Sequence, residues 1–214
     1  MEMNGLTLYK YIRENYQENE PIFVSEIQIE GMTDVNLRQQ IKKLADSGKI
    51  RRFDTGIYFI PKETMFRSGS QLSPYKVIEK KYLQNEKQRC GYIGGLMFAN
   101  QMGLTTQVPM VYEVITNKAT KDYRETRLAK TRVIIKRPRV AVTEDNYKIL
   151  QFLDLMKDID SYSEIKGEQL QRRLFGYLQA IKLNFSMLEP YLSYYPDRIY
   201  KNMYETGMLN GISS

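Results

Sequence analysis

The sequence predicts an α+β fold in two parts. Apolar residues recur at helical spacing in residues 6–16 and 34–48, whereas short segments between 50 and 60 and between 108 and 136 have the pattern of β-strands. From residue 144 onward the apolar stripes are helical again. We therefore expect a small β-sheet within a second part that is mainly helical.

The N-terminal part predicts three helices followed by a two-stranded hairpin. Ser25 is a plausible N-cap for a brief second helix, and the turn Asp54-Thr55-Gly56 separates the two strands of the hairpin. This order of elements is that of a winged helix-turn-helix, in which the third helix enters the major groove of DNA. The predicted elements are helices at 6–16, 25–31 and 34–48, a short strand at 22–24, and two strands within 47–61.

The third helix has an apolar stripe and a polar face. Leu37, Ile41 and Leu44 form the stripe, and Asn, Gln, Arg and Lys residues lie on the other side. Such side chains can contact base edges and phosphates, although an exposed helix with ordinary polar decoration or a protein-docking module would look similar. The predicted DNA-binding residues are Asn36, Arg38, Gln39, Gln40, Lys42 and Lys43 on the helix, with Lys49, Arg51 and Arg52 on the hairpin.

The positive charge is concentrated in two segments. The chain has a formal net charge of +7, with −4 in residues 1–30, +4 in residues 31–67 and +7 in residues 118–139. A basic excess in short segments suggests a polyanionic partner.

The second basic segment predicts two strands with basic ends around Val133-Ile134-Ile135. If the strands alternate, Arg124 and Arg127 point to opposite faces, so neither face is purely basic. Nucleic-acid binding, docking of an acidic partner and plain surface charge all fit this pattern. The cations of this second basic surface are Arg124, Arg127, Lys130, Arg132, Lys136, Arg137 and Arg139.

A stretch without clear periodicity separates the two parts. Residues 61–73 contain Pro, Gly and three Ser. The predicted organisation is a DNA-binding domain at 1–62, a linker at 63–72 and a second α+β domain at 73–214. Ser73 is its predicted N-cap, and its second helix is predicted at 93–102.

Composition excludes several kinds of chemistry. The chain has no His, so it cannot form a Ser-His-Asp triad or a His-containing metal site. Cys90 is the single cysteine and has no partner for an intrachain disulfide, which suits a reducing compartment. No apolar run approaches the ~20 residues of a membrane span, and the N-terminus lacks the pattern of a signal peptide. We expect a cytoplasmic protein without a membrane partner.

Catalytic patterns are weak. Glu164-Ile165-Lys166, with Asp154, Asp158 and Asp160 upstream, has the residue types of a metal-dependent nuclease, but these residues fall between helices rather than on a strand. Gly91, Gly94 and Gly95 lack the G-K-[ST] ending of a phosphate loop and suit close helix packing better. We expect a protein that is not an enzyme and needs no metal or cofactor, with a nuclease as a remote alternative.

The segment "CGYIGGLMFANQMGLTTQVPMVYEVITNKA" resembles the central signature of the AbiEi-type antitoxins of type IV toxin–antitoxin systems, the abortive-infection family. That family commonly opens with a winged helix ending in an "L..G.I.R...G.Y..P" pattern. Residues 44–61 resemble it, with one more residue between Leu44 and Gly48; the corresponding positions are Leu44, Gly48, Ile50, Arg52, Gly56, Tyr58 and Pro61. The matching positions of the central signature are Gly91, Tyr92, Gly103, Leu104, Thr105, Thr106, Gln107 and Pro109, followed by Val111, Tyr112 and Thr116.

The resemblance implies a transcriptional autoregulator that binds operator repeats in the double-stranded DNA upstream of its own operon. It also implies that the protein opposes a nucleotidyltransferase toxin. Such antitoxins need not form a stable complex with the toxin, so the resemblance does not imply a toxin-binding groove.

Overall fold

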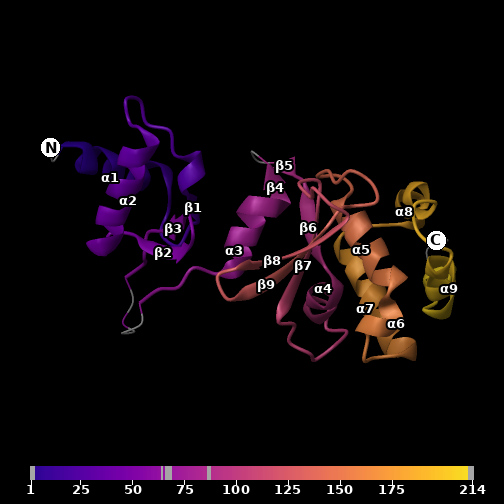
Figure 1. Cartoon of the computed structure of the whole chain (residues 1–214). Helices are drawn as coiled ribbons and strands as arrows, with labels where there is room; N and C mark the ends of the chain where they lie inside the picture. Colours follow the sequence, from indigo (N-terminus) through magenta and orange to yellow (C-terminus); the bar gives the residue numbers. More distant parts are fainter. Residues whose placement is uncertain (1–2, 64, 66–68, 86–87, 212–214) are drawn as a thin grey trace. The chain divides into compact units, whose positions relative to one another are not determined.

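The computed structural model describes residues 3–63, 65, 69–85 and 88–211. The chain is an α+β protein that divides into two compact units, residues 1–80 and residues 81–214, whose elements are labelled in Figure 1. The predicted α+β class is therefore confirmed. Each unit is described below by itself.

The first unit combines two main helices with a three-stranded antiparallel sheet of order β1-β3-β2. Nine buried apolar side chains from the helices, strands and loops form its core. The predicted stripes of the first and third helices are confirmed, because Leu8, Ile12, Leu37, Ile41 and Leu44 all belong to this core. The elements are α1(Met3–Asn15), β1(Ile22–Phe23), η1(Val24–Glu26), α2(Asp34–Asp46), β2(Arg51–Asp54) and β3(Ile57–Phe59).

The predicted second helix is wrong. Only a 3-10 turn forms at Val24–Glu26, and Ser25 lies inside this turn instead of capping a helix. Ile27 is buried and Ile29 is half-buried, whereas Gln28 between them is exposed. This alternation has the period of extended backbone, and Ile27 indeed has φ −78° and ψ 119°. Residues 27–33 therefore form a loop that leads into α2.

The segment after the hairpin is packed against the first unit. The helix α3(Pro74–Ile78) begins after Ser73, as predicted, and continues into the π-helical turn η2(Glu79–Leu83). Lys76 Nζ donates to the Asn19 carbonyl at 3.1 Å. Lys80 Nζ lies 3.3 Å from Glu20 Oε1 and 4.7 Å from the ring centre of Tyr16. Residues 74–80 thus lie with the first unit, whereas the sequence placed them in the second domain.

The predicted linker at 63–72 falls partly on residues 64 and 66–68, which lie outside the described residues. Its described part is not a loose connection. Ser70 and Leu72 are buried, and the Lys62 N–H donates to Ser70 Oγ at 2.7 Å.

The second unit contains a four-stranded sheet of order β6-β7-β9-β8. β7 runs parallel to β9, and the other two pairs are antiparallel. The three strands predicted between 108 and 136 are confirmed, although the first of them begins only at Val111. The helix predicted at 93–102 starts later because Gly91–Gly94 is a strand. The β elements are β4(Gln84–Asn85), β5(Gln88–Arg89), β6(Gly91–Gly94), β7(Val111–Thr116), β8(Tyr123–Leu128) and β9(Thr131–Lys136).

Helices supply most of the core of the second unit, as the C-terminal stripes predicted. Leu150, Leu153, Leu174 and Leu178 join Tyr92 and Ile115 of the sheet in one apolar cluster. No helix in the described ranges is long and apolar enough to cross a membrane. The helices are α4(Gly95–Gln101), α5(Tyr147–Lys157), α6(Ile159–Tyr162), α7(Gly167–Ala180), α8(Phe185–Leu192), α9(Arg198–Glu205) and α10(Met208–Gly211).

Candidate nucleic-acid interface

The helix α2 is fixed at its start and along its inner side. Thr33 is the N-cap, and its Oγ1 accepts from the Asn36 N–H at 3.3 Å. Leu37, Ile41 and Leu44 are each at most 7% exposed. Because one side of the helix is buried in the core, the opposite side must face outward.

The outward side of α2 carries exposed polar side chains. Arg38, Gln39, Lys42 and Lys43 are all exposed, and within the described part of the chain their side chains form no hydrogen bond or ion pair. Arg and Gln side chains can pair with base edges, and Lys side chains can contact phosphates. Asp46 shares this face near the end of the helix and would oppose a phosphate.

Gln40, which belongs to the predicted DNA-binding set, lies on the buried side of α2 and is therefore poorly placed to reach DNA. Its side chain is 7% exposed, and its Nε2 donates to Asn36 Oδ1 at 3.4 Å. Helical periodicity places Gln40 between Leu37 and Leu44 on the inner side. Asn36 is half-buried, and its side-chain oxygen is already used by this bond.

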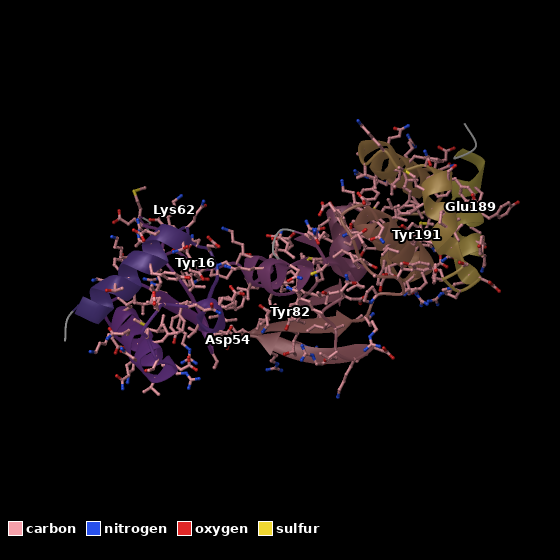
Figure 2. All side chains as sticks on the ribbon, turned by 90° about the horizontal axis from the view of Figure 1, so that it is seen from above. Tyr16, Asp54, Lys62, Tyr82, Glu189 and Tyr191 are labelled. Atoms are coloured by element: carbon pink, nitrogen blue, oxygen red, sulfur yellow. The ribbon has the colours of Figure 1, made fainter. Side chains whose placement is uncertain are left out.

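The hairpin turn at Asp54 (Figure 2) is stabilised by Arg52, one of the predicted DNA-binding residues. Arg52 Nε donates to the Asp54 carbonyl at 3.3 Å, and Arg52 Nη2 donates to Thr55 Oγ1 at 3.0 Å. Gly56 has φ +71°, a conformation that favours glycine. The predicted turn is confirmed, and Arg52 stabilises it.

The other two hairpin cations also have contacts within the first unit. Lys49 Nζ lies 4.8 Å from the ring centre of Tyr9, a cation–π geometry. Arg51 Nη1 donates to the Ser70 carbonyl at 3.4 Å. Both side chains are exposed, so a phosphate could still approach them, but it would compete with these contacts.

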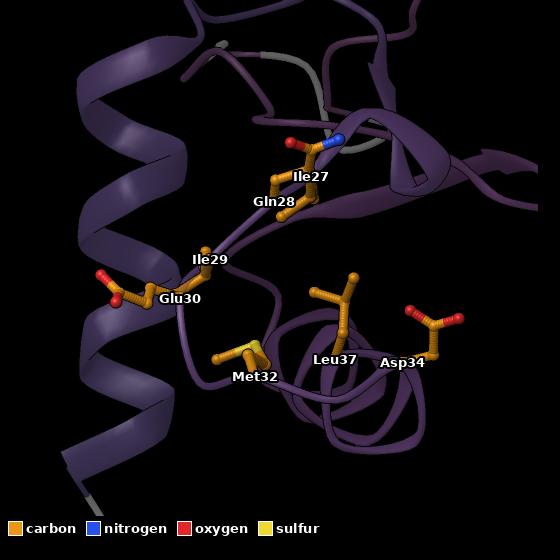
Figure 3. Close-up of a pocket in the computed structure, with 7 residues that line it drawn as sticks. All are labelled: Ile27, Gln28, Ile29, Glu30, Met32, Asp34 and Leu37. Atoms are coloured by element: carbon orange, nitrogen blue, oxygen red, sulfur yellow. The ribbon is translucent and has the colours of Figure 1, made fainter.

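A pocket with a cavity of about 400 Å³ lies beside the start of α2 (Figure 3). Its apolar walls come from the extended loop that replaced the predicted second helix. Glu30 and Asp34 add two exposed carboxylates, and no described cation forms an ion pair with either. This end of α2 is therefore acidic and repels phosphates. The lining residues are Ile27, Gln28, Ile29, Glu30, Met32, Asp34 and Leu37.

The second basic surface does not form one patch. In the register of β8 and β9, Arg124 pairs with Ile135 and Arg127 pairs with Arg132, so Arg124 and Arg127 point to opposite faces, as predicted. Arg124, Arg127 and Lys130 have no polar partner in the described ranges. The other four cations do: Arg132 with Glu125 (3.3 Å), Lys136 with Glu113 (2.9 Å), Arg137 with Asp122 (3.4 Å), and Arg139 with the Tyr194 carbonyl (3.1 Å).

The residues of the central signature form a strand, a helix end and a tethered loop. Gly91 and Tyr92 begin β6, and Gly103, with φ +68°, ends α4. Asn100 Nδ2 donates to the carbonyls of Thr105 and Gln107 at 3.2 and 2.9 Å, which closes the loop. Leu104 and Thr105 are buried, Thr106 and Gln107 are exposed, and Pro109 is half-buried.

Glu164, the carboxylate of the nuclease alternative, anchors this same loop. Its Oε2 accepts from the N–H and the hydroxyl of Thr106 at 2.8 and 2.9 Å. These bonds and others from Thr105 and Gln107 favour the ionised form and lower the pKa of Glu164 to about 2. The carboxylate is thus used for structure.

The aspartates of the nuclease alternative do not gather around a metal-sized space. Asp154 Oδ2 accepts from the Tyr92 hydroxyl at 2.6 Å, and Lys157 Nζ lies 3.1 Å from Asp158 Oδ2. Burial raises the pKa of Asp154, although the bond from Tyr92 opposes this shift. No group of three or more His, Cys, Asp or Glu in the described part of the chain could hold a metal ion.

The glycines before α4 do not cradle a phosphate either. Gly95 has φ +60°, and a Cβ at this position would lie 3.0 Å from Glu113 Oε2. A carboxylate therefore lies where a phosphate would have to approach, which disfavours an anion there.

No protein-family model matches the sequence, and comparison with curated proteins finds no relative.

The outward face of α2 is the best-supported candidate site, because its exposed side chains have the chemistry that contacts base edges and phosphates. Sequence reasoning identified its cations but missed the carboxylates Glu30, Asp34 and Asp46 that border it. Placing Asp46 on the same helical wheel as Gln39 and Lys42 would have found one of them.

Proposed function

We propose that this protein binds double-stranded DNA through α2 and regulates the transcription of its own operon, as an antitoxin of a type IV toxin–antitoxin system in the cytoplasm. The observation that carries the DNA half is the outward face of α2, where the side chains of Arg38, Lys42 and Lys43 are exposed and pair with no other described residue. The order α1, α2, β2, β3 supports a winged helix-turn-helix in which the turn η1 takes the place of the second helix.

The side chains of α2 have different roles in this proposal. Gln39 would pair with a base edge, and Arg38, Lys42 and Lys43 would contact phosphates. The hairpin would lie along the DNA backbone, with Lys49 beside it. The acidic pocket at the start of α2 would have to stay clear of the phosphates, so the middle of the helix would enter the groove.

The antitoxin half of the proposal rests on the resemblance of residues 91–109 and 44–61 to AbiEi-type antitoxins. In this proposal the protein opposes a nucleotidyltransferase toxin encoded next to it, without requiring a stable complex. Expression of that neighbouring gene should stop growth, and co-expression of this protein should restore it. Failure to restore growth would contradict the antitoxin role.

The DNA half is tested by binding of the full chain to the DNA upstream of its own gene and to a shuffled duplex. Gln39→Ala should reduce the preference for the upstream DNA by about tenfold, because one base-pairing side chain contributes about 1–3 kcal/mol of discrimination. Gln17→Ala, which removes another exposed glutamine of the first unit, should leave the preference unchanged. Equal binding of the unchanged protein to both duplexes would contradict sequence-specific regulation.

A protein-docking role is the second candidate. It is favoured by the pocket beside α2, whose apolar walls and two unpaired carboxylates suit a basic peptide, and by the internal contacts of the hairpin cations. Co-elution of the protein with a candidate protein in size-exclusion chromatography, without any retardation of DNA in a gel shift, would favour this role over DNA binding.

A further inference from the structure

A second cavity, of about 420 Å³, lies within the second unit between the end of α4 and one face of α7. Arg172, Arg173 and Gly176 of α7 border it, and their spacing of three and four residues places them on one side of the helix. The leucine stripe of α7 is buried in the core, which fixes the direction of this exposed side.

The floor of this cavity is aromatic and held in place. Phe98 is 4% exposed, and its ring contacts that of Tyr177 edge to face, with ring centres 5.5 Å apart. Tyr177 in turn stacks on Phe152 at 6.1 Å with an interplanar angle of 12°. Met102 completes the apolar part. A planar ring can lie on such a surface with little loss of entropy by the protein.

The rim of the cavity is cationic. Arg173 has no ion-pair partner in the described ranges, and none of the described lining residues is a carboxylate. Arg172 Nη2 lies 3.6 Å from Glu168 Oε2, but these side chains are 79% and 89% exposed, so the pair is weak. Gln169, Arg172 and Arg173 also line an adjoining hollow, and both arginines are exposed.

Gly176 keeps the cavity open. A glycine inside a helix costs roughly 0.5–1 kcal/mol relative to alanine. A Cβ at Gly176 would have no neighbour within 4 Å, so crowding does not require a glycine here. A larger side chain at this position would instead project into the cavity.

We infer that this cavity binds a nucleoside phosphate, with the base on the aromatic floor and the phosphates between Arg172 and Arg173. The guanidinium group pairs with phosphate oxygens through two parallel hydrogen bonds. Gln101, which is exposed and has no other polar partner in the described ranges, offers an amide to the edge of the base. The aromatic side chains and this amide favour a nucleotide over an acidic peptide. The cavity has the size of small-ligand sites, about 300–1,000 Å³.

Isothermal titration calorimetry on the full chain tests this inference. The probes are ATP, GTP, CTP and UTP, inorganic tripolyphosphate, a single-stranded oligodeoxynucleotide without terminal phosphates, and an oligoglutamate peptide. At least one nucleoside triphosphate should bind with a Kd below about 1 mM and about tenfold more tightly than tripolyphosphate or the peptide. Binding of the oligonucleotide as well would identify nucleotides of a single strand as the source, and binding of free nucleotides alone would identify the free form.

Two matched pairs of variants locate the site. Gly176→Met, which fills the cavity, and Arg172→Gln with Arg173→Gln should each weaken nucleotide binding about tenfold or more. Gly176→Ala should not weaken it, and neither should Arg124→Gln with Arg127→Gln, which removes the same charge elsewhere. Circular dichroism and thermal melting show whether each variant folds. If Gly176→Met does not fold, the variant with Arg172→Gln and Arg173→Gln, whose changes are at exposed positions, decides the result.

Several results would overturn the inference: no binding of any nucleotide, equal binding of tripolyphosphate, tighter binding of the peptide, or loss of binding only in the Arg124 and Arg127 variant. Variants of α2 should leave nucleotide binding unchanged. Failure of this site is therefore distinguishable from failure of the proposed DNA binding.

Discussion

The three unpaired cations of α2 set how strongly DNA binding should depend on salt. Each phosphate contact contributes about −0.9 to the slope of log K against log salt concentration. Arg38, Lys42 and Lys43 together give a slope of about −2.7, which lowers affinity roughly 40-fold between 50 and 200 mM salt. If the three hairpin cations also contacted phosphates, the slope would be about −5.4 and the loss roughly 2,000-fold.

We expect the smaller slope, because Arg51 and Arg52 would have to give up hydrogen bonds to the Ser70 carbonyl and to the hairpin turn, and Lys49 would have to leave the ring of Tyr9. Fluorescence anisotropy of a labelled upstream duplex, titrated with the full chain at several salt concentrations, measures this slope. Changing Arg38, Lys42 and Lys43 to Gln should bring it close to zero and remove most of the affinity at low salt.

The control removes three unpaired cations from the second unit, by changing Arg124, Arg127 and Lys130 to Gln. Net charge falls equally in the two triple variants, so a general effect of charge would change both slopes alike. If the control lost the salt dependence and the α2 variant kept it, DNA would be bound by the second unit, and the proposed role of α2 would be refuted.

Three further outcomes are expected. Asp34→Asn should tighten DNA binding at low salt in the anisotropy assay while lowering thermal stability slightly, because it removes a carboxylate that repels phosphate but favours the start of the helix. Gly91→Ala should destabilise the protein to urea by about 1–3 kcal/mol, since a Cβ there would lie 2.7 Å from two backbone oxygens, whereas Gly176→Ala should stabilise it. The low pKa of Glu164 implies stability that is present above its ordinary value, 4.5, and lost as the pH falls toward about 2, so the difference in melting temperature between the protein and Glu164→Gln should shrink over this range.

Local patterns in the sequence predicted most elements of the fold. The stripe of α2 was readable because residues three and four apart share one side of a helix, and the strand at 131–136 because its apolar residues were flanked by basic ends. The second helix predicted for the first unit was wrong because the local pattern in that segment is short. The alternation of Ile27 and Ile29 covers only a few residues, so the prediction followed the expected order of elements instead.

The exposure of the α2 cations could be predicted, but the partners of the hairpin cations could not. Arg51 contacts Ser70, which is 19 residues away, and Glu164 contacts Thr106 across 58 residues. Such contacts arise only when the chain packs, so composition and spacing carry no signal for them. Gln40 is different, because helical spacing alone places it on the inner side with Leu37 and Leu44, and its burial agrees with that position.

The internal hydrogen bonds of Arg52 limit how the hairpin can take part in DNA binding. Arg52 donates hydrogen bonds to the Asp54 carbonyl and the Thr55 hydroxyl of the hairpin turn. If its guanidinium group moved to bind a phosphate, both bonds would be lost and the turn would be less stable. A hydrogen bond contributes a net of about 0.5–1.5 kcal/mol to stability. A phosphate contact of Arg52 would therefore have to contribute more free energy than the two lost hydrogen bonds together. The hairpin is therefore better suited to set the distance between α2 and the DNA backbone than to bind the phosphates through Arg52. On this reasoning Arg52→Lys, which keeps the charge but cannot reproduce both bonds, should lower thermal stability and leave the salt slope unchanged. A flatter slope with unchanged stability would instead show that Arg52 contacts phosphate.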